Sequence, residues 1–336
     1  MTDSHLTFEI MRRAPKILFR SAGSIFLLAT LLAQTPVPPK PPSDEPAVEQ
    51  PQGKEFVFRA TVNEVLLYAT VLDERGRQVM GLDRASFNVF EDNLPQAITS
   101  FHNDDVPVSV GIVIDNSASM QKKRQAVNQA ALNFVRASNK NDEVFVVNFN
   151  WDAYIDQDFT ANVSLLKQAL ENIDARGGTY LYDALIASAD HVAKGGRREK
   201  KVLLLVTDGL DETSKHTLED ASDFLQKDGG PILYAIGLFD EESGHDRRIG
   251  QRALNRLTAA TGGKAFFPKS LEEVDAITKQ VAHDIRTQYT IGYKPAKPTE
   301  QGGYRSIRVE AKAPGKGRLE VRTKSGYFAG QKKTSG

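Results

Sequence analysis

Short apolar runs alternate with segments of helical spacing through the middle of the chain, and this rhythm constrains the fold more than any other feature. The runs are VSVGIVI (residues 108–114), EVFVVNF (143–149), KVLLLV (201–206) and PILYAIGLF (231–239). Continuous apolar runs of this length are typical of strands buried on both faces of a sheet. Helices are expected within residues 121–138, 162–173, 180–194, 217–226, 246–260 and 271–286. The sequence therefore predicts an α/β domain over residues 107–287, with a doubly wound, mostly parallel, Rossmann-like sheet.

The segments on either side of this domain have the period of two that marks antiparallel strands. Residues 55–106 alternate apolar and polar side chains around the turn DERGR (73–77), with a first strand expected at 56–62. Residues 288–336 alternate again, with one strand expected over RLEVRTKSGYF (318–328). Both are predicted to form small antiparallel β segments, the second either alone or joined to the first. Residues 35–54 hold seven of the 15 prolines and are expected to be an extended linker without a core.

Residues 1–34 are predicted to be a signal peptide or an N-terminal anchor. Four basic residues between positions 12 and 20 precede the apolar stretch SAGSIFLLATLLA (21–33), which fits a secretory signal and is short for a membrane span. Cleavage after Ala33 would leave Leu31 where a small residue is preferred, so an uncleaved anchor is the alternative. In either case we expect an exported protein, located in the periplasm, in the cell envelope or outside the cell. Only an uncleaved segment would bring the chain to the membrane.

Composition excludes several kinds of chemistry. The chain has no cysteine, which rules out thiol nucleophiles, thiolate metal sites and disulfides. Its formal net charge is zero, so no overall field would attract nucleic acid. We therefore expect no nucleic-acid partner.

Oxygen-bearing side chains follow the predicted strands where a site is expected. Asp115, Ser117 and Ser119 come after the first apolar run, Asp208 lies in TDG after KVLLLV, and a Gly-Gly turn precedes Thr179. In open α/β sheets, sites form at the carboxyl ends of the strands. Mg²⁺ and similar hard cations prefer oxygen ligands. Because the hydroxyls are neutral, an ion held by only two carboxylates stays electrophilic and can accept a carboxylate from outside.

The same residues resemble the metal-ion-dependent adhesion site of the von Willebrand factor type A domain. All five positions match that pattern in order and spacing: Asp115, Ser117, Ser119, Thr179 and Asp208. The resemblance implies that the serines and Thr179 reach a metal ion through their hydroxyls and that the two aspartates act directly or through water. The flanking segments resemble a narrower group of exported bacterial proteins called von Willebrand factor type A-related. In this chain Ala118 replaces a glycine common in the family, at a position that is not a ligand.

Simpler interpretations of these residues exist. Ser117 or Ser119 could cap the following helix, and Asp208 could be a turn residue. We expect Asp183 to be a helix-start charge, and the basic run QKKRQ (121–125) to be a solvated helix face.

An aspartate at the end of the first strand of such a sheet could also be the nucleophile of a phosphatase or phosphotransferase. Phosphatases that use an aspartate nucleophile usually carry a second Asp two residues on, whereas here that position is Ser117. The common nucleotide-binding, hydrolase and metalloprotease motifs are absent from the sequence. We expect no enzymatic activity.

The expected function is metal-dependent binding. A divalent cation, Mg²⁺ in the first place with Mn²⁺ or Ca²⁺ as alternatives, would capture an acidic group on an extracytoplasmic partner protein. The alternative is a structural or assembly component of the cell envelope that uses the domain as a docking surface without metal.

Overall fold

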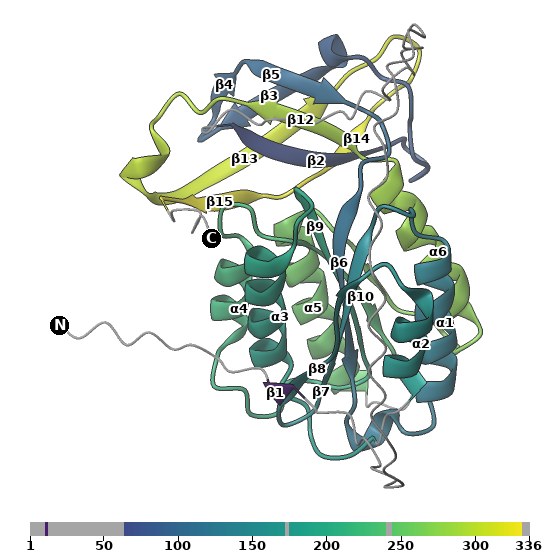
Figure 1. Cartoon of the computed structure of the whole chain (residues 1–336). Helices are drawn as coiled ribbons and strands as arrows, with labels where there is room; N and C mark the ends of the chain where they lie inside the picture. Colours follow the sequence, from purple (N-terminus) through teal and green to yellow (C-terminus); the bar gives the residue numbers. More distant parts are fainter. Residues whose placement is uncertain (1–10, 13–63, 172–174, 240–243, 331–336) are drawn as a thin grey trace, which may run out of the picture. The chain divides into compact units, whose positions relative to one another are not determined.

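A computed structural model describes residues 11–12, 64–171, 175–239 and 244–330 (Figure 1). The described part of residues 62–336 lies in one compact unit. The predicted signal segment, the linker and the first expected strand of the N-terminal β segment, at residues 56–62, lie outside the described residues, apart from the two-residue strand at 11–12. Among the helices in the described ranges, none has the length and apolarity needed to cross a bilayer.

The predicted doubly wound sheet is present. It has seven strands in the order β1-β8-β7-β6-β9-β10-β11. Five neighbouring strands are parallel: β7 (Glu143–Phe149), β6 (Val108–Asp115), β9 (Lys200–Thr207), β10 (Ile232–Gly237) and β11 (Ala265–Phe266). β8 (Ala153–Thr160) runs antiparallel to β7 and pairs in parallel with β1 (Met11–Arg12). The order of the strands places the ends of β6 and β9 side by side.

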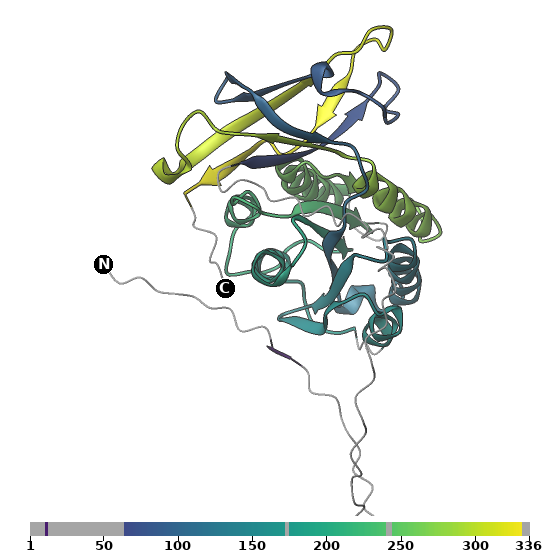
Figure 2. The same ribbon diagram turned by 45° about the horizontal axis from the view of Figure 1, so that its top comes forward.

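Helices cover both faces of this sheet (Figures 1 and 2). One apolar core contains residues of α1 (Arg124–Arg136), α2 (Val163–Glu171) and α6 (Glu273–Arg286). The core on the opposite face contains residues of α3 (Leu181–Gly195), α4 (Leu218–Leu225) and α5 (Gly244–Thr261). The alternation of strands and helices therefore yields the layered arrangement that the sequence predicted.

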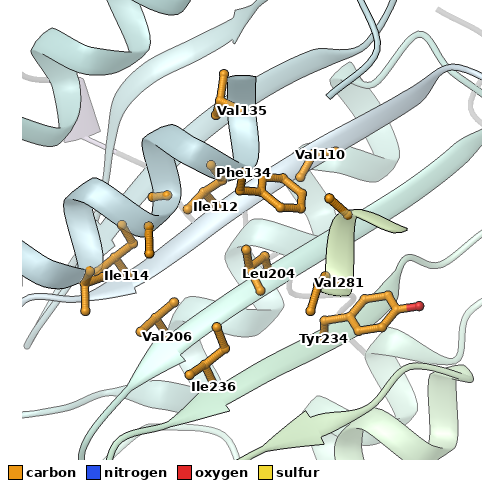
Figure 3. Close-up of a cluster of buried hydrophobic side chains, with 14 of the residues drawn as sticks. Val110, Ile112, Ile114, Phe134, Val135, Leu204, Val206, Tyr234, Ile236 and Val281 are labelled. Atoms are coloured by element: carbon orange, nitrogen blue, oxygen red, sulfur yellow. The ribbon is translucent and has the colours of Figure 1, made fainter. Parts of the chain in front are cut away.

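The burial of strand β6 on both faces of the sheet explains its apolar sequence. Ile112 and Ile114 point into the core with α1 and α6 (Figure 3), whereas Val113 belongs to the core with α3. All three side chains are fully buried. Burying one such side chain stabilises a fold by about 1.5–3 kcal/mol. A strand with helices on both faces can make this gain on each of its two sides, which explains the absence of polar alternation.

The segments before and after the α/β domain form one two-sheet β structure, here called the sandwich. Its sheets have the orders β14-β2-β12-β5 and β15-β13-β3-β4, so strands from both ends of the chain interleave. Both sheets contribute to one apolar core. The bounds are β2 (Val65–Leu72), β3 (Phe87–Glu91), β4 (Leu94–Gln96), β5 (Ile98–His102), β12 (Tyr289–Tyr293), β13 (Gly303–Ala311), β14 (Glu320–Arg322) and β15 (Gly326–Ala329).

Two regions of the chain differ from the expectation. β8 is not predicted from the sequence, because its residues are mostly half-buried and only half of them are apolar, as suits a strand near the sheet edge. RLEVRTKSGYF (318–328) was expected to be one strand, but it contains two. β14 pairs with β2 in one sheet of the sandwich, and β15 pairs with β13 in the other. The backbone at 323–325 makes the crossing, and periodicity alone does not reveal a change of sheet.

Candidate metal centre

The two candidate aspartates lie at neighbouring strand ends. Asp115 is the last residue of β6, and Asp208 follows the last residue of β9. The strands are paired in parallel, so both residues leave the sheet at its carboxyl edge. Their exposed fractions are 0% and 1%. Two carboxylates buried this deeply require compensating partners.

Asp115 is held by two hydrogen bonds. Its Oδ1 accepts from the backbone N–H of Ser117 at 2.9 Å, and its Oδ2 accepts from the Thr207 hydroxyl at 2.6 Å. Burial raises the pKa of Asp115 to about 6, while these hydrogen bonds act in the opposite direction, and the nearby charge of Asp208 raises the pKa further. The carboxylate is therefore fixed in place and shielded from water.

Hydroxyl groups connect the first loop to Asp208. The Ser119 hydroxyl donates to Asp208 Oδ1 at 2.8 Å, and the hydroxyl oxygens of Ser117 and Ser119 are 3.1 Å apart. Ser117 occupies the N-cap position of a short 3-10 helix, residues Ala118–Met120, but its side chain makes no capping hydrogen bond. The geometry therefore disfavours the interpretation of Ser117 as a simple helix cap.

Thr179 is brought to the same edge by backbone contacts. The N–H of Ala118 donates to the carbonyl of Gly177 at 3.0 Å, and the N–H of Glu212 donates to the carbonyl of Thr179 at 2.9 Å. Thr179 is buried, and a Cβ atom built on Gly209 would lie 3.1 Å from its hydroxyl oxygen. The three loops that carry the five candidate residues are thus joined to one another at one edge of the sheet.

The Gly-Gly turn is needed because two side chains cover it. Gly177 has a positive φ of 82°, a conformation that other residues adopt at a cost. A Cβ on Gly178 would lie 2.0 Å from Glu212 Oε2 and 2.7 Å from Trp151 Nε1. Trp151 is 57% exposed. The sequence does not reveal Trp151 and Glu212 at this rim, since only the folded chain brings these loops together.

A buried lysine also contacts the cluster. Lys123 Nζ donates to Asp208 Oδ2 at 2.8 Å and to the carbonyl oxygen of Leu238 at 3.3 Å. Its next neighbour, Arg124, donates to the carbonyl of Asp115 at 3.3 Å. The expectation that QKKRQ forms a solvated face is therefore wrong for Lys123 and Arg124, which are both buried. Helical spacing could have indicated this for Lys123, because it lies four residues before the buried Val127.

Asp183 has a structural role away from this cluster. Its carboxylate accepts from the backbone N–H groups of Lys215 and His216 at 3.0 and 3.1 Å, and contacts His216 Nδ1 at 2.7 Å. It lies in the first turn of α3, as expected, and in addition anchors the loop after Asp208. Residues 240–243, which precede α5, lie outside the described residues.

The donor set suits a hard cation. Within the described ranges, no group of three or more His, Cys, Asp or Glu side chains is placed to hold a metal ion. The candidate cluster instead brings two carboxylates together with the hydroxyls of Ser117 and Ser119, and Thr179 lies against Gly209 beside Asp208. Such oxygen donors, supplemented by water, fit Mg²⁺ or a similar ion and not a soft metal.

Fold and cluster together define an open α/β domain with an oxygen-rich group at the carboxyl edge of its central strands. Residues 110–210 match the sequence model of the von Willebrand factor type A domain family. The α/β domain of this chain is a von Willebrand factor type A domain, and all five candidate residues lie within the matched stretch. No comparison tests the resemblance of the flanking segments to the narrower exported group, which stays a prediction.

Similar proteins cover only parts of the chain. The uncharacterized protein sll0103 of Synechocystis sp. is 28% identical over 114 residues, which are 33% of this chain and 27% of that protein. The chain thus matches about a quarter of that relative's length.

Two solved structures from bacterial pili are also similar, each at 15% identity and a TM-score of 0.46. The PilB minor pilin from Streptococcus sanguinis matches over 55% of this chain and 63% of its own. The von Willebrand factor domain of the pilus tip protein Mfa5 from Porphyromonas gingivalis matches over 54% and 95%. At these identities, the similarities say nothing about the site residues.

Proposed function

We propose that this protein is an exported, non-enzymatic binding module that holds a divalent cation and uses it to capture a carboxylate of a partner protein. The ion is Mg²⁺ in the first place, with Mn²⁺ or Ca²⁺ as alternatives. Its ligands are Asp115, Ser117, Ser119, Thr179 and Asp208. The observation that carries the proposal is the hydrogen-bonded chain from Ser117 through Ser119 to Asp208, beside the buried Asp115.

Each residue has a distinct task in this proposal. Asp115 and Asp208 supply negative charge, either on the ion or through water, and their burial keeps that charge from being screened. Ser117 and Ser119 offer neutral oxygens, and Ser119 is exposed, so its side of the cluster is accessible. Thr179 approaches from a separate loop next to Gly209. A bound divalent cation would act as a Lewis acid toward an incoming carboxylate.

The surroundings of the serines support binding over catalysis. A serine nucleophile needs a neighbouring base to activate it. The hydroxyl of Ser119 donates to Asp208, and the other oxygen of that carboxylate is engaged by the Lys123 ammonium. Both oxygens of this carboxylate are thus already occupied by hydrogen bonds within the site.

One observation favours a second candidate function, a structural docking surface in the cell envelope that needs no metal. The ion pair between Lys123 and Asp208 compensates one of the two buried carboxylates from within the protein. A domain of this kind would bind its partner through the surface of the loops alone. The two candidates differ in whether binding depends on a divalent cation.

Calorimetric titration of the chelator-treated protein with Mg²⁺ and Mn²⁺ tests the proposal. Wild type should bind in the millimolar range or tighter, and Asp115→Ala and Asp208→Ala should lose binding. Ser164→Ala provides a control, since Ser164 is an exposed serine in the first turn of α2 and away from the site. Wild-type protein that binds no divalent cation up to millimolar concentrations would leave metal-independent docking as the remaining function.

A further inference from the structure

Lys123 and Asp208 form an ion pair inside the candidate metal centre. Their side chains have exposed fractions of 4% and 1%, and Nζ lies 2.8 Å from Oδ2. A lysine is rarely buried this deeply, since its ammonium must give up its water. This pair has a local partner in the carbonyl of Leu238, which also accepts from Nζ. The lysine is therefore part of the site and not a surface charge that reaches toward it.

The two oxygens of Asp208 face different groups. Oδ1 accepts from the Ser119 hydroxyl, on the side of the other candidate ligands, whereas Oδ2 accepts from Lys123. A cation among the hydroxyls would thus share the carboxylate with the lysine without displacing it. Lys123 acts on such an ion through charge and not by blocking its place.

The charges of the site do not balance a divalent cation once Lys123 is included. Asp115 and Asp208 contribute two negative charges and Lys123 one positive charge, which leaves a net charge of −1. Arg124 adds a further positive charge, and Asp156, joined to it through Asn148, adds a further negative charge, so this pair leaves the sum unchanged. A bound divalent cation would leave the buried cluster with a net charge of +1. One carboxylate from outside would restore neutrality.

We infer that Lys123 makes cation binding by this site depend on the partner's carboxylate. This inference rests on the proposed function and adds a rule for its regulation. The protein alone holds the ion weakly, because the lysine has already compensated half of the negative charge. The ion and the partner's carboxylate then bind cooperatively, each raising the affinity for the other by the same factor. Without Lys123, the ion binds tightly whether or not a carboxylate is present.

The experiment compares two adjacent lysines in the full chain. Lys123→Met removes the buried charge, and Lys122→Met removes an exposed one, with the same change in sequence composition and net charge.

Mg²⁺ and Mn²⁺ affinities are measured by calorimetry, with acetate as the carboxylate probe and chloride at equal ionic strength as its control. Lys123→Met should bind the ion at least about tenfold more tightly than wild type, a factor within the usual range of coupling between sites. Lys122→Met should stay close to wild type. Acetate should raise the affinity of wild type and of Lys122→Met for the metal ion. The same addition should raise the affinity of Lys123→Met much less.

Folding of the variants is followed in the same samples. Lys123→Met leaves Asp208 buried without its counter-ion, so its melting temperature should fall without metal and recover when Mg²⁺ is added. The double variant Lys123→Met with Asp208→Asn removes both charges, and it should fold and bind no ion. It shows that the methionine itself is tolerated.

The possible outcomes distinguish a failure of the role inferred for Lys123 from a failure of the proposed function. Ion binding by wild type that Lys123→Met leaves unchanged or weakens overturns the role of Lys123 and leaves the proposed function intact. If acetate raises the ion affinity of wild type and of Lys123→Met by the same factor, Lys123 does not couple the ion to the carboxylate, and the inference is overturned. Binding that is seen only in Lys123→Met, with wild type binding no divalent cation even in acetate, overturns the proposed function, and the inference falls with it. If neither protein binds a divalent cation, the proposed function fails, and the inference fails with it.

Discussion

The Thr207 hydroxyl donates a 2.6 Å hydrogen bond to Asp115 Oδ2 and thereby ties the end of β9 to the end of β6. Both residues have an exposed fraction of 0%. Thr207 directly precedes Asp208, so the same segment that carries one candidate ligand also fixes the other. The relative position of the two carboxylates thus depends on a side chain that is not itself a candidate ligand.

Replacing Thr207 by valine keeps its shape and removes this donor. We expect Thr207→Val to lower the free energy of unfolding by about 1–3 kcal/mol, because a buried carboxylate oxygen loses its partner. The affinity for Mg²⁺ should also fall, since the Asp115 carboxylate is freer to turn. Chemical denaturation and calorimetry measure the two effects. Thr207→Ser keeps the hydroxyl and should retain most of the affinity; a serine variant that behaves like valine would show that packing, and not the hydrogen bond, is responsible.

Glu91 in the sandwich is a second buried carboxylate with a full set of partners. It accepts from the hydroxyls of Tyr293 and Tyr327 at 2.6 and 3.0 Å and from Arg305 at 3.1 Å. Arg305 is also buried. Glu91→Gln should therefore leave the charge of Arg305 uncompensated and lower the free energy of unfolding by about 3–5 kcal/mol. Urea denaturation gives the loss, and Glu310→Gln on the exposed face of the neighbouring β13 is the control, expected to cost far less. Equal losses in the two variants would contradict the role of Glu91.

The sequence predicts the parts of this fold that depend on local pattern. Strands buried on both faces show continuous apolar runs, as β6 does, and the positions of the candidate ligands follow from their places after such strands. Fold class and the meeting of Asp115 with Asp208 could therefore be predicted from the chain alone.

What the sequence does not reveal depends on which strands and loops become neighbours. The crossing between β14 and β15 and the interleaving of strands from both ends of the chain come from pairing over long separations, which no local period encodes. The prediction of a solvated helix face was wrong for Lys123 for a related reason. A basic residue among other basic residues resembles a solvated surface, and only its contact with Asp208, 85 positions away, shows that it is buried.

Lys200 gives the stability of this protein a dependence on pH. Its ammonium lies at the start of β9, donates to the carbonyl of Ile285 and sits 5.0 Å from the centre of the Tyr68 ring. Burial, and then the charge of Arg286, lower the pKa of Lys200 to about 7 from 10.5. Between these pH values the unfolded chain binds the proton and the folded protein releases it. Stability linked to this group is therefore full above pH 10.5 and is lost as the pH falls through about 7.

We expect Lys200→Met to remove this contribution. The difference in unfolding free energy between wild type and variant should change by about 1.4 kcal/mol for each unit of the pKa shift, and should change most between neutral and alkaline pH. Urea denaturation over that range measures it. Lys201→Met, at the neighbouring and more exposed position, should run parallel to wild type. If the difference in unfolding free energy between wild type and Lys200→Met were the same at every pH, the pKa of Lys200 would not be lowered in the folded protein.

The turn that delivers Thr179 can be tested at Gly177. Its φ of 82° disfavours any side chain, and a Cβ there would lie 3.1 Å from the Trp151 ring. Gly177→Ala should cost about 1–2 kcal/mol from the left-handed backbone. The displaced turn should also weaken Mg²⁺ binding, since Thr179 follows two residues later. Trp151 is the only tryptophan, so its fluorescence should report the displacement directly.

Gly76 provides a matched control, because it has a similar φ of 71° and a Cβ there would meet nothing within 4 Å. Gly76→Ala should therefore show a similar loss of stability, with the fluorescence of Trp151 and the affinity for Mg²⁺ unchanged. If Gly177→Ala lost stability to the same extent but kept both the wild-type fluorescence and the wild-type affinity, the turn would have no part in placing Thr179 at the ion. The candidate ligand set would then be reduced to the residues of the other two loops.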